Sequence, residues 1–586
     1  MKPHISSFIR LTARGAVVLF ILSLMLPGLL GQINTVKAAA RCGAGMRCVY
    51  LPILSSGTRA ATGDLSITGI EVTQGVQNSA NSIPLVAGRS AVVRIFARGQ
   101  EALPAGSSNV TVSIAANPSG AGLSSAPFLL SVNLPVTPSR GVYSSTINVP
   151  LPAVWLTGSY DLSITLDPQN QVPENNEGNN TFVQRLSFTN VPTLRVKIVP
   201  VRYTHSLDGH LYPAPTNDSI SDWIMRLYPL SKVEISWHAP YTYNGNLKDV
   251  AGFSDLLSQI SRLKKDEGGP ADQVYYALAP TTDGNFSWFN GGVVGIGYIG
   301  NRVALGVNHS NAGQTAAHEI GHNLGRYHAP CGGAASSDPA YPYQSAAIGE
   351  YGLDLTTGAL HAPDSSRDIM SYCSPKWISD YTYRALLDAQ IRVASAASSL
   401  AAADMQTGPV LNVRALVTST GTRLLPVYSA EGLPDMPAQD SPYRLQLMGV
   451  DGQVLADLPV PALEIATEDD QPQFEIQGSL SLPDAPVQTV RVWKADELLA
   501  ETHLDGSPIA GSEVLLASAN SAAATTLTGQ VLRWPQADRP VVVRYSLDGG
   551  QSWTTLAMDV NGGQLDLTAA GVPETAQFEV IPAISH

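Results

Sequence analysis

One short stretch constrains this chain more than any other, and it reads His318-Glu319-Ile320-Gly321-His322-Asn323-Leu324-Gly325-Arg326-Tyr327-His328. His318 and His322 are four residues apart, so on a helix both imidazoles project from one face. Three histidines with one open position form a known ligand set for a catalytic zinc ion. Glu319 is adjacent to the first ligand, where it can act on a zinc-bound water rather than on the metal.

Gly325 predicts the end of that helix, because glycine tolerates the positive φ that turns the chain. His328 follows three residues later, and the turn would bring its imidazole to the other two. The remaining histidines considered have no partner at ligand spacing and are expected to be structural: His205, His210, His238, His309 and His361.

The five positions His318, Glu319, His322, Gly325 and His328 match the HExxHxxGxxH pattern of the metzincin metallopeptidases. The segment Asp368–Cys373 resembles their methionine turn, and its Met370-Ser371-Tyr372 ending is similar to serralysins and astacins. The resemblance covers about residues 193–400. It implies one Zn²⁺ held by the three histidines, with Glu319 as general base and Tyr372 as a hydrogen-bond donor to the oxyanion. It also implies that Met370 packs beneath the metal without touching it.

Four cysteines, at positions 42, 48, 331 and 373, form an even number and suggest disulfides in an exported chain. A Cys331–Cys373 bond would tie the segment after the zinc helix to the methionine turn, and Cys42 and Cys48 would then close a small loop. The sequence leaves the pairing open. Arg41-Cys42-Gly43 also resembles the cysteine switch of matrix metallopeptidases, but Cys48 is close by and the flanking prolines of that motif are absent.

The N-terminus predicts export. Lys2, Arg10 and Arg14 precede the apolar run 16–30, and Ala38-Ala39-Ala40 offers small residues for cleavage near Ala40. We therefore expect a secreted chain with residues 1–40 as signal peptide and no membrane span after cleavage. The net charge of −13, from 35 basic and 48 acidic residues, argues against nucleic acid as a partner.

Residues 41–62 read as a linker, and residues 63–191 as a β-sandwich, with candidate strands at 110–114, 143–149 and 159–166. Its ending, Val172-Pro173-Glu174-Asn175-Asn176-Glu177-Gly178-Asn179-Asn180, resembles the immunoglobulin-like CARDB modules. Calcium is a second candidate cation for this Asn/Glu cluster, but no clear motif supports it, and a solvated turn is the preferred interpretation.

Residues 192–403 alternate between strands and helices, as α/β domains do. Candidate strands lie at 194–201, 233–237, 273–278, 292–299 and 303–307, and candidate helices at 218–230, 253–263, 312–324 and 379–394. This order resembles the upper subdomain of metzincins. The resemblance implies that strand 303–307 lies at the sheet edge and binds an extended peptide.

The last part returns to β character, as an accessory sandwich at 408–512 and a fibronectin-like domain at 513–586. Candidate strands are 411–417, 443–448, 474–479 and 489–493, and 541–553 reads as a hairpin closed by Asp548-Gly549-Gly550. The expected fold class is therefore multidomain, with an α/β (α+β) metzincin-like catalytic domain flanked by β-sandwich domains.

The expected function is that of a secreted zinc endopeptidase that cleaves extracellular proteins or glycoproteins. The alternative is a secreted or surface adhesin whose peptidase-like domain is only a scaffold. A combined hypothesis has the β modules hold the enzyme on its substrate. The sequence leaves open the peptide-bond preference, the ligands of the β modules and the oligomeric state. It also leaves open whether residues 41–190 are a removable prosegment.

Overall fold

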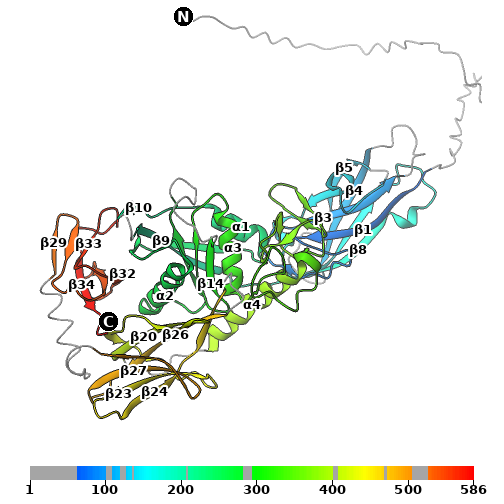
Figure 1. Cartoon of the computed structure of the whole chain (residues 1–586). Coiled ribbons are helices and arrows are strands. Elements are labelled where there is room, and N and C mark those ends of the chain that lie inside the picture. The colour runs from blue at the N-terminus through cyan, green and yellow to red at the C-terminus, as the bar shows by residue number, and fades with distance from the viewer. Residues whose placement is uncertain are drawn as a thin grey trace, which may run out of the picture. The chain divides into compact units, whose positions relative to one another are not determined.

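The computed structural model describes residues 63–585 except 100–108, 119–126, 135–136, 206–208, 282–292, 400–406, 467–471 and 505–524. The predicted signal peptide, the linker and the Cys42–Cys48 pair lie outside the described residues. The described part is a multidomain, strand-rich structure (Figure 1). Within it, none of the helices combines the length and the apolar character needed to cross a membrane.

The N-terminal domain is a sandwich of two sheets, in which inward side chains from both sheets share one core. Strand β7 (Ser159–Leu166) has the same bounds as the strand predicted at 159–166. Every second residue of β7 is buried, as expected for a strand with one face in the core. Of the predicted strand 143–149, the first residues form the 3₁₀ turn η1 (Tyr143–Ser145) instead. One sheet contains β1 (Leu65–Thr73), β3 (Val92–Gly99) and β6 (Ile147–Pro150); the other contains β2 (Leu85–Val86), β8 (Thr181–Thr189), β7 (Ser159–Leu166), β4 (Asn109–Pro118) and β5 (Phe128–Asn133).

The central domain has a sheet with helices on both faces. Its strands are ordered β11 (Val233–Trp237), β9 (Leu194–Thr204), β13 (Gln273–Ala279), β15 (Val303–Val307) and β14 (Gly295–Tyr298), all parallel except β14. Helix α2 (Val250–Asp266) packs on one face, and α1 (Ser219–Leu227), α3 (Ala312–Asn323) and α4 (Asp380–Ser399) share the core on the other. The short β10 (Leu211–Tyr212) and β12 (Tyr241–Tyr243) also pair with β9.

Two small ribbons follow α3. Strands β16 (Gly352–Leu353) and β17 (Leu360–His361) pair antiparallel, and β18 (Arg367–Asp368) and β19 (Lys376–Trp377) pair parallel. The second ribbon flanks the methionine turn, so it fixes the position of residues 369–375.

The accessory sandwich contributes one of its sheets to the central sheet, because β25 (Ala462–Ala466) pairs antiparallel with β14. That sheet continues through β26 (Gln473–Ser481), β20 (Gly408–Thr418), β21 (Gly421–Leu424) and β22 (Tyr428–Gly432). The facing sheet contains β24 (Val454–Pro459), β23 (Tyr443–Gly449), β27 (Val487–Lys494) and β28 (Glu497–His503). In Figure 1, β20 and β26 run beside α2, in agreement with the bond from Ser258 on α2 to Glu475 on β26.

The C-terminal domain consists of two three-stranded sheets. The predicted hairpin is confirmed, since β31 (Val541–Ser546) and β32 (Thr554–Val560) pair antiparallel around Asp548-Gly549-Gly550. The boundary predicted at 512/513 lies outside the described residues. The sheets contain β29 (Thr526–Thr528), β30 (Val531–Arg533) and β33 (Gln564–Asp566), and β32 (Thr554–Val560), β31 (Val541–Ser546) and β34 (Gln577–Pro582).

Candidate active site

Helix α3 carries His318, Glu319 and His322, and it ends as its sequence predicts. Gly325 has φ +82°, a left-handed conformation that suits glycine, and its N–H donates to the His322 carbonyl at 2.8 Å. The reversal leads the chain through Arg326 and Tyr327 back to His328. The predicted turn at Gly325 is therefore confirmed.

The three imidazoles converge through their Nε2 atoms. The His322 Nε2 atom lies 3.1 Å from that of His318 and 3.1 Å from that of His328. All three side chains are buried. Among the described residues, these histidines are the one group of three His, Cys, Asp or Glu side chains whose ligand atoms lie within 4.8 Å of one another.

Each imidazole is held by a backbone carbonyl at its other nitrogen. The Nδ1 atoms lie 2.8 Å from the Ile369 oxygen for His318, 2.6 Å from the Arg326 oxygen for His322, and 2.6 Å from the Ala335 oxygen for His328. A carbonyl only accepts, so each Nδ1 carries the proton and donates it, and each Nε2 presents a lone pair to the shared point. The three carbonyls thus select the tautomer that a metal ligand needs.

Burial also favours the neutral imidazole. It lowers the pKa of His318 and His322 well below the ordinary value, and the neighbouring histidines lower both further. Burial likewise lowers the pKa of His328. Neutral imidazole is the ligand form of histidine, so the site is prepared for a cation.

The residues present fit zinc. Tetrahedral ligands about 2.0–2.1 Å from zinc lie roughly 3.3 Å from each other, close to the 3.1 Å spacing of the Nε2 atoms. Three neutral imidazoles leave a fourth position open, as catalytic zinc sites do. An all-nitrogen donor set is poorly suited to calcium or magnesium, which prefer oxygen ligands.

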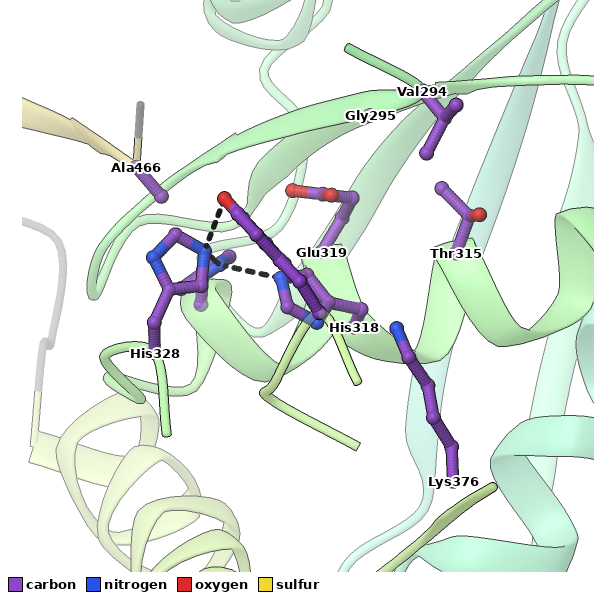
Figure 2. Close-up of a pocket in the computed structure, with 10 residues that line it drawn as sticks. Val294, Gly295, Thr315, His318, Glu319, His328, Lys376 and Ala466 are labelled. Carbon is purple, nitrogen blue, oxygen red and sulfur yellow. Dashed lines mark hydrogen bonds between the residues drawn. The ribbon is translucent and has the colours of Figure 1, made fainter. Parts of the chain in front are cut away.

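A cavity of about 290 Å³ lies over the histidines, and Glu319 lines it. Figure 2 shows Glu319 between two ends of this cavity, with Ala466 and His328 toward one end and Val294, Thr315 and Lys376 toward the other. Glu319 is 5% exposed, so its carboxylate can meet water only through the cavity.

Met370 and Tyr372 lie where the methionine-turn resemblance implies. A Cβ atom on Gly321 would come within 2.5 Å of the Met370 sulfur, so the thioether packs directly against the helix turn between His318 and His322. The Tyr372 hydroxyl lies 3.2 Å from His328 Nε2 and lines the cavity. Met370 thus packs against the helix that carries His318 and His322, and Tyr372 lines the cavity; the roles expected of both stay predictions.

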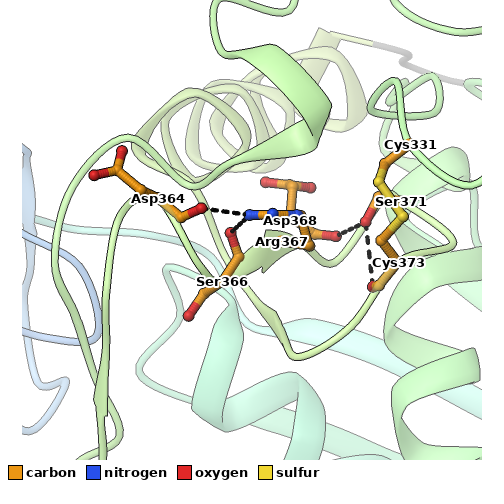
Figure 3. Close-up of a disulfide and its surroundings, with 7 residues drawn as sticks. All are labelled: Cys331, Asp364, Ser366, Arg367, Asp368, Ser371 and Cys373. Carbon is orange, nitrogen blue, oxygen red and sulfur yellow. Dashed lines mark hydrogen bonds between the residues drawn. A yellow bond between two sulfur atoms is a disulfide. The ribbon is translucent and has the colours of Figure 1, made fainter.

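The Cys331–Cys373 disulfide is confirmed, and its cysteines are 42 positions apart in the sequence. Figure 3 shows the bond beside Ser371, whose hydroxyl donates to the Asp368 carbonyl at 2.8 Å. The Tyr372 N–H also donates to the Cys331 carbonyl at 3.4 Å. The disulfide thus fastens the segment after His328 to the turn that carries Met370 and Tyr372.

The prediction that strand 303–307 forms the sheet edge is wrong. That strand is β15, which lies between β13 and β14, because β14 folds back antiparallel onto it. The edge belongs to β14, and β25 covers part of it by pairing Ala466 with Gly297 and Ile465 with Tyr298. Tyr327, next to His328, donates from its hydroxyl to Glu464 of β25 at 2.9 Å. The accessory sandwich is therefore part of the cavity wall.

Sequence reasoning missed five lining residues: Val294, Gly295, Thr315, Lys376 and Ala466. Thr315 could have been predicted from its spacing, since it lies four residues before Glu319 and so on the same helix face. Lys376 and Ala466 could not have been predicted, because nothing in their local sequence relates them to α3.

The Asn/Glu cluster of the N-terminal domain bonds to its own fold. Glu174 accepts from the Leu65 N–H at 2.7 Å and from the Asn180 amide at 2.5 Å. Asn180 is 3% exposed, so the expected solvated turn is in part a buried one. Calcium binding by this cluster stays a prediction.

The five histidines expected to be structural are not part of the triad. His238 bonds to Glu267 at 2.6 Å, and His361 stacks on Trp377 with ring centroids 4.1 Å apart. His309 Nε2 lies 2.9 Å from the Thr315 hydroxyl. The His205 N–H donates to the His210 carbonyl at 2.9 Å. These contacts agree with structural roles.

No protein-family model and no curated protein matches this chain. Among solved structures, the chain is similar to the CARDB domain of the PF1109 protein from Pyrococcus furiosus in complex with di-metal ions, at 16% identity and a TM-score of 0.16, over 22% of this chain and 93% of that one. A solution structure of the same domain is similar at 16% identity and a TM-score of 0.15, over 22% of this chain and 97% of that one. A chaperone-substrate complex is similar at 12% identity and a TM-score of 0.21, over 43% of this chain and 39% of that one. CARDB domains, which the sequence resembles, thus recur among the similar structures, and the fold itself rests on the strand pairing described above.

Proposed function

We propose that this chain is an exported zinc endopeptidase of the metzincin type, which hydrolyses peptide bonds of extracellular proteins or glycoproteins. The observation that carries the proposal is the convergence of three Nε2 lone pairs beside Glu319, each set by an Nδ1–H bond to a carbonyl. The HExxHxxGxxH pattern and the Met370-Ser371-Tyr372 turn support the family.

His318, His322 and His328 would hold the ion. A zinc ion bound there supplies Lewis acidity to a water molecule and to a peptide carbonyl. The carbonyl bonds at Nδ1 keep all three rings in orientation, and Met370 fixes the floor of the site by packing against Gly321.

Glu319 is the general base in this proposal. Its carboxylate takes a proton from water as the water attacks the peptide carbonyl, and the same proton then passes to the leaving amine. Glu319 is 5% exposed, so its carboxylate is largely removed from bulk solvent. Tyr372 contributes a hydroxyl that can donate to the developing oxyanion.

The test compares the wild-type chain with Glu319→Gln, both loaded with zinc. We expect Glu319→Gln to retain one zinc per chain by elemental analysis and to lose cleavage of a peptide library by at least about a hundredfold. Glu497→Gln, an exposed carboxylate on β28, serves as the matched control and keeps full activity. Equal activity of wild type and Glu319→Gln, or no chelator-sensitive cleavage by wild type, would refute the proposal.

A further inference from the structure

Lys376 places a cation at one end of the candidate active-site cavity. It is the first residue of β19, and its side chain points toward Glu319 and His318 from the end that Val294 and Thr315 also line (Figure 2). Its backbone is fixed, because β19 pairs with β18 and the next residue, Trp377, is buried and donates to the Gly75 carbonyl at 2.9 Å. The ammonium therefore belongs to the cavity wall.

The ammonium forms no hydrogen bond or ion pair with any residue in the described part of the chain. Burial lowers the pKa of Lys376. The carboxylates of Glu319 and Asp368 act on the ammonium only through longer-range electrostatics and oppose that shift. Asp368 is already satisfied by the N–H groups of Met370 at 2.8 Å and Ser379 at 2.9 Å. A desolvated cation without a close partner is costly, and an anionic ligand would remove that cost.

The strand β14 sets the direction of an extended peptide in this cavity. A Cβ atom on Gly295 would lie 2.5 Å from the Glu319 carboxylate, so the β14 backbone passes directly beside the candidate base. Both neighbours of β14 run antiparallel to it, and β25 ends at Ala466, opposite Gly297. A peptide that pairs with β14 beyond Ala466, in the same direction as β25, runs from the Ala466 end of the cavity toward the Val294 and Lys376 end. Its C-terminal side thus reaches Lys376.

We propose that Lys376 binds the side-chain carboxylate of an aspartate or glutamate that directly follows the scissile bond. This inference rests on the proposed peptidase function and names its substrate class: peptides cleaved on the N-terminal side of an acidic residue. Among the described residues that line the cavity, the opposite end offers Ala466 and no charged side chain for the residue before the bond.

The first experiment uses fluorogenic peptides that differ only in the residue after the scissile bond, which is Asp, Asn or Lys. Wild type should cleave the Asp peptide with a kcat/KM roughly ten- to a hundredfold above that of the Asn peptide. Lys376→Met should bring this ratio to about one, and Lys376→Glu should favour the Lys peptide. A ratio of two substrates on one protein does not depend on the folded fraction, so partial misfolding leaves the test valid.

Lys232→Met is the matched control, since Lys232 is exposed and pairs with Glu234. It should keep the wild-type ratio. A wild-type ratio near one, a preference for Asn or Lys, or an unchanged ratio in Lys376→Met would overturn the role of Lys376 while leaving the peptidase proposal intact.

A binding experiment separates the two proposals. Fluorescence anisotropy of the Asp and Asn peptides is measured with zinc-loaded Glu319→Gln and with Glu319→Gln/Lys376→Met, after the zinc content of both has been determined. The single variant should prefer the Asp peptide roughly tenfold or more, and the double variant should not. If wild type cleaves no peptide, the proposed function fails and this binding ratio still decides on Lys376. Equal affinities, or no binding of either peptide, would overturn the inference.

Discussion

The Tyr372 hydroxyl lies 3.2 Å from Nε2 of His328, the same nitrogen that faces His322 Nε2 at 3.1 Å. The opposite ring nitrogen of His328 donates to the Ala335 carbonyl, so Nε2 has only a lone pair and Tyr372 must be the donor. The hydroxyl is therefore aimed at the point where the three histidines converge.

Replacing Tyr372 by phenylalanine should lower kcat without removing the metal. The loss of one oxyanion donor costs about a hundredfold in kcat. KM and zinc content should change little, because the ring keeps its packing against His328. Steady-state kinetics with elemental analysis checks this, and Tyr143→Phe in the N-terminal domain is the control. A Tyr372→Phe protein with wild-type kcat would remove Tyr372 from the mechanism.

Zinc should stabilise the chain, since the proposed site holds three imidazoles together only when the chain is folded. At a free zinc concentration a hundred times the Kd, the gain is about 2.7 kcal/mol. Calorimetry of the chelator-treated chain, with and without added zinc, measures the shift in Tm. His328→Ala should abolish the shift, whereas His503→Ala on β28 should keep it. The same shift in both variants would contradict the assignment of His328.

The Cys331–Cys373 bond should stabilise the central domain and the site. It spans 42 residues, a loop for which chain entropy gives about 3–4 kcal/mol. The double variant Cys331→Ser/Cys373→Ser should therefore melt at lower temperature and bind zinc more weakly, because Tyr372 and Met370 lose their tether to the segment after His328. Thermal unfolding with and without reductant tests this. The result expected for the double variant is a Tm that reductant does not lower further; an unchanged Tm of wild type in reductant would speak against a stabilising bond.

Glu475 should make stability depend on pH. This carboxyl is fully buried, where it accepts from Ser258 of α2 at 2.8 Å and from Tyr298 of β14. Burial raises its pKa from 4.5 to about 8. Between these values the folded chain holds a proton that the unfolded chain releases, so its contribution is complete below 4.5 and is lost as pH rises through about 8.

Within that window the unfolding free energy attributable to Glu475 falls by at most about 1.4 kcal/mol per pH unit. Unfolding midpoints at pH 6, 7 and 8 should decline less steeply for Glu475→Gln than for wild type. Glu497→Gln, exposed on β28, should follow wild type. Parallel curves for Glu475→Gln and wild type would show that this carboxyl does not hold the extra proton.

Much of the candidate site could be predicted from sequence because its ligands are close in the chain. The four-residue spacing of His318 and His322 needs only an α-helix to bring the rings together, and Gly325 needs only its missing Cβ to turn the chain toward His328. The strands and helices of the central domain were placed by the same local periodicity, as α3 at residues 312–323 shows. Where a short segment had no such constraint, as at Tyr143–Ser145, a strand was predicted and a 3₁₀ turn is found.

The sequence by itself determined the candidate zinc-ligand set, the general-base candidate and the turn that unites them, since each depends on spacing within a few residues. The tertiary structure alone decided that β14 and not β15 forms the edge, that β25 covers part of it, and that Lys376 enters the cavity. Strand order depends on pairing between segments far apart in the chain, and no local pattern encodes which edge a strand such as Ala462–Ala466 will meet.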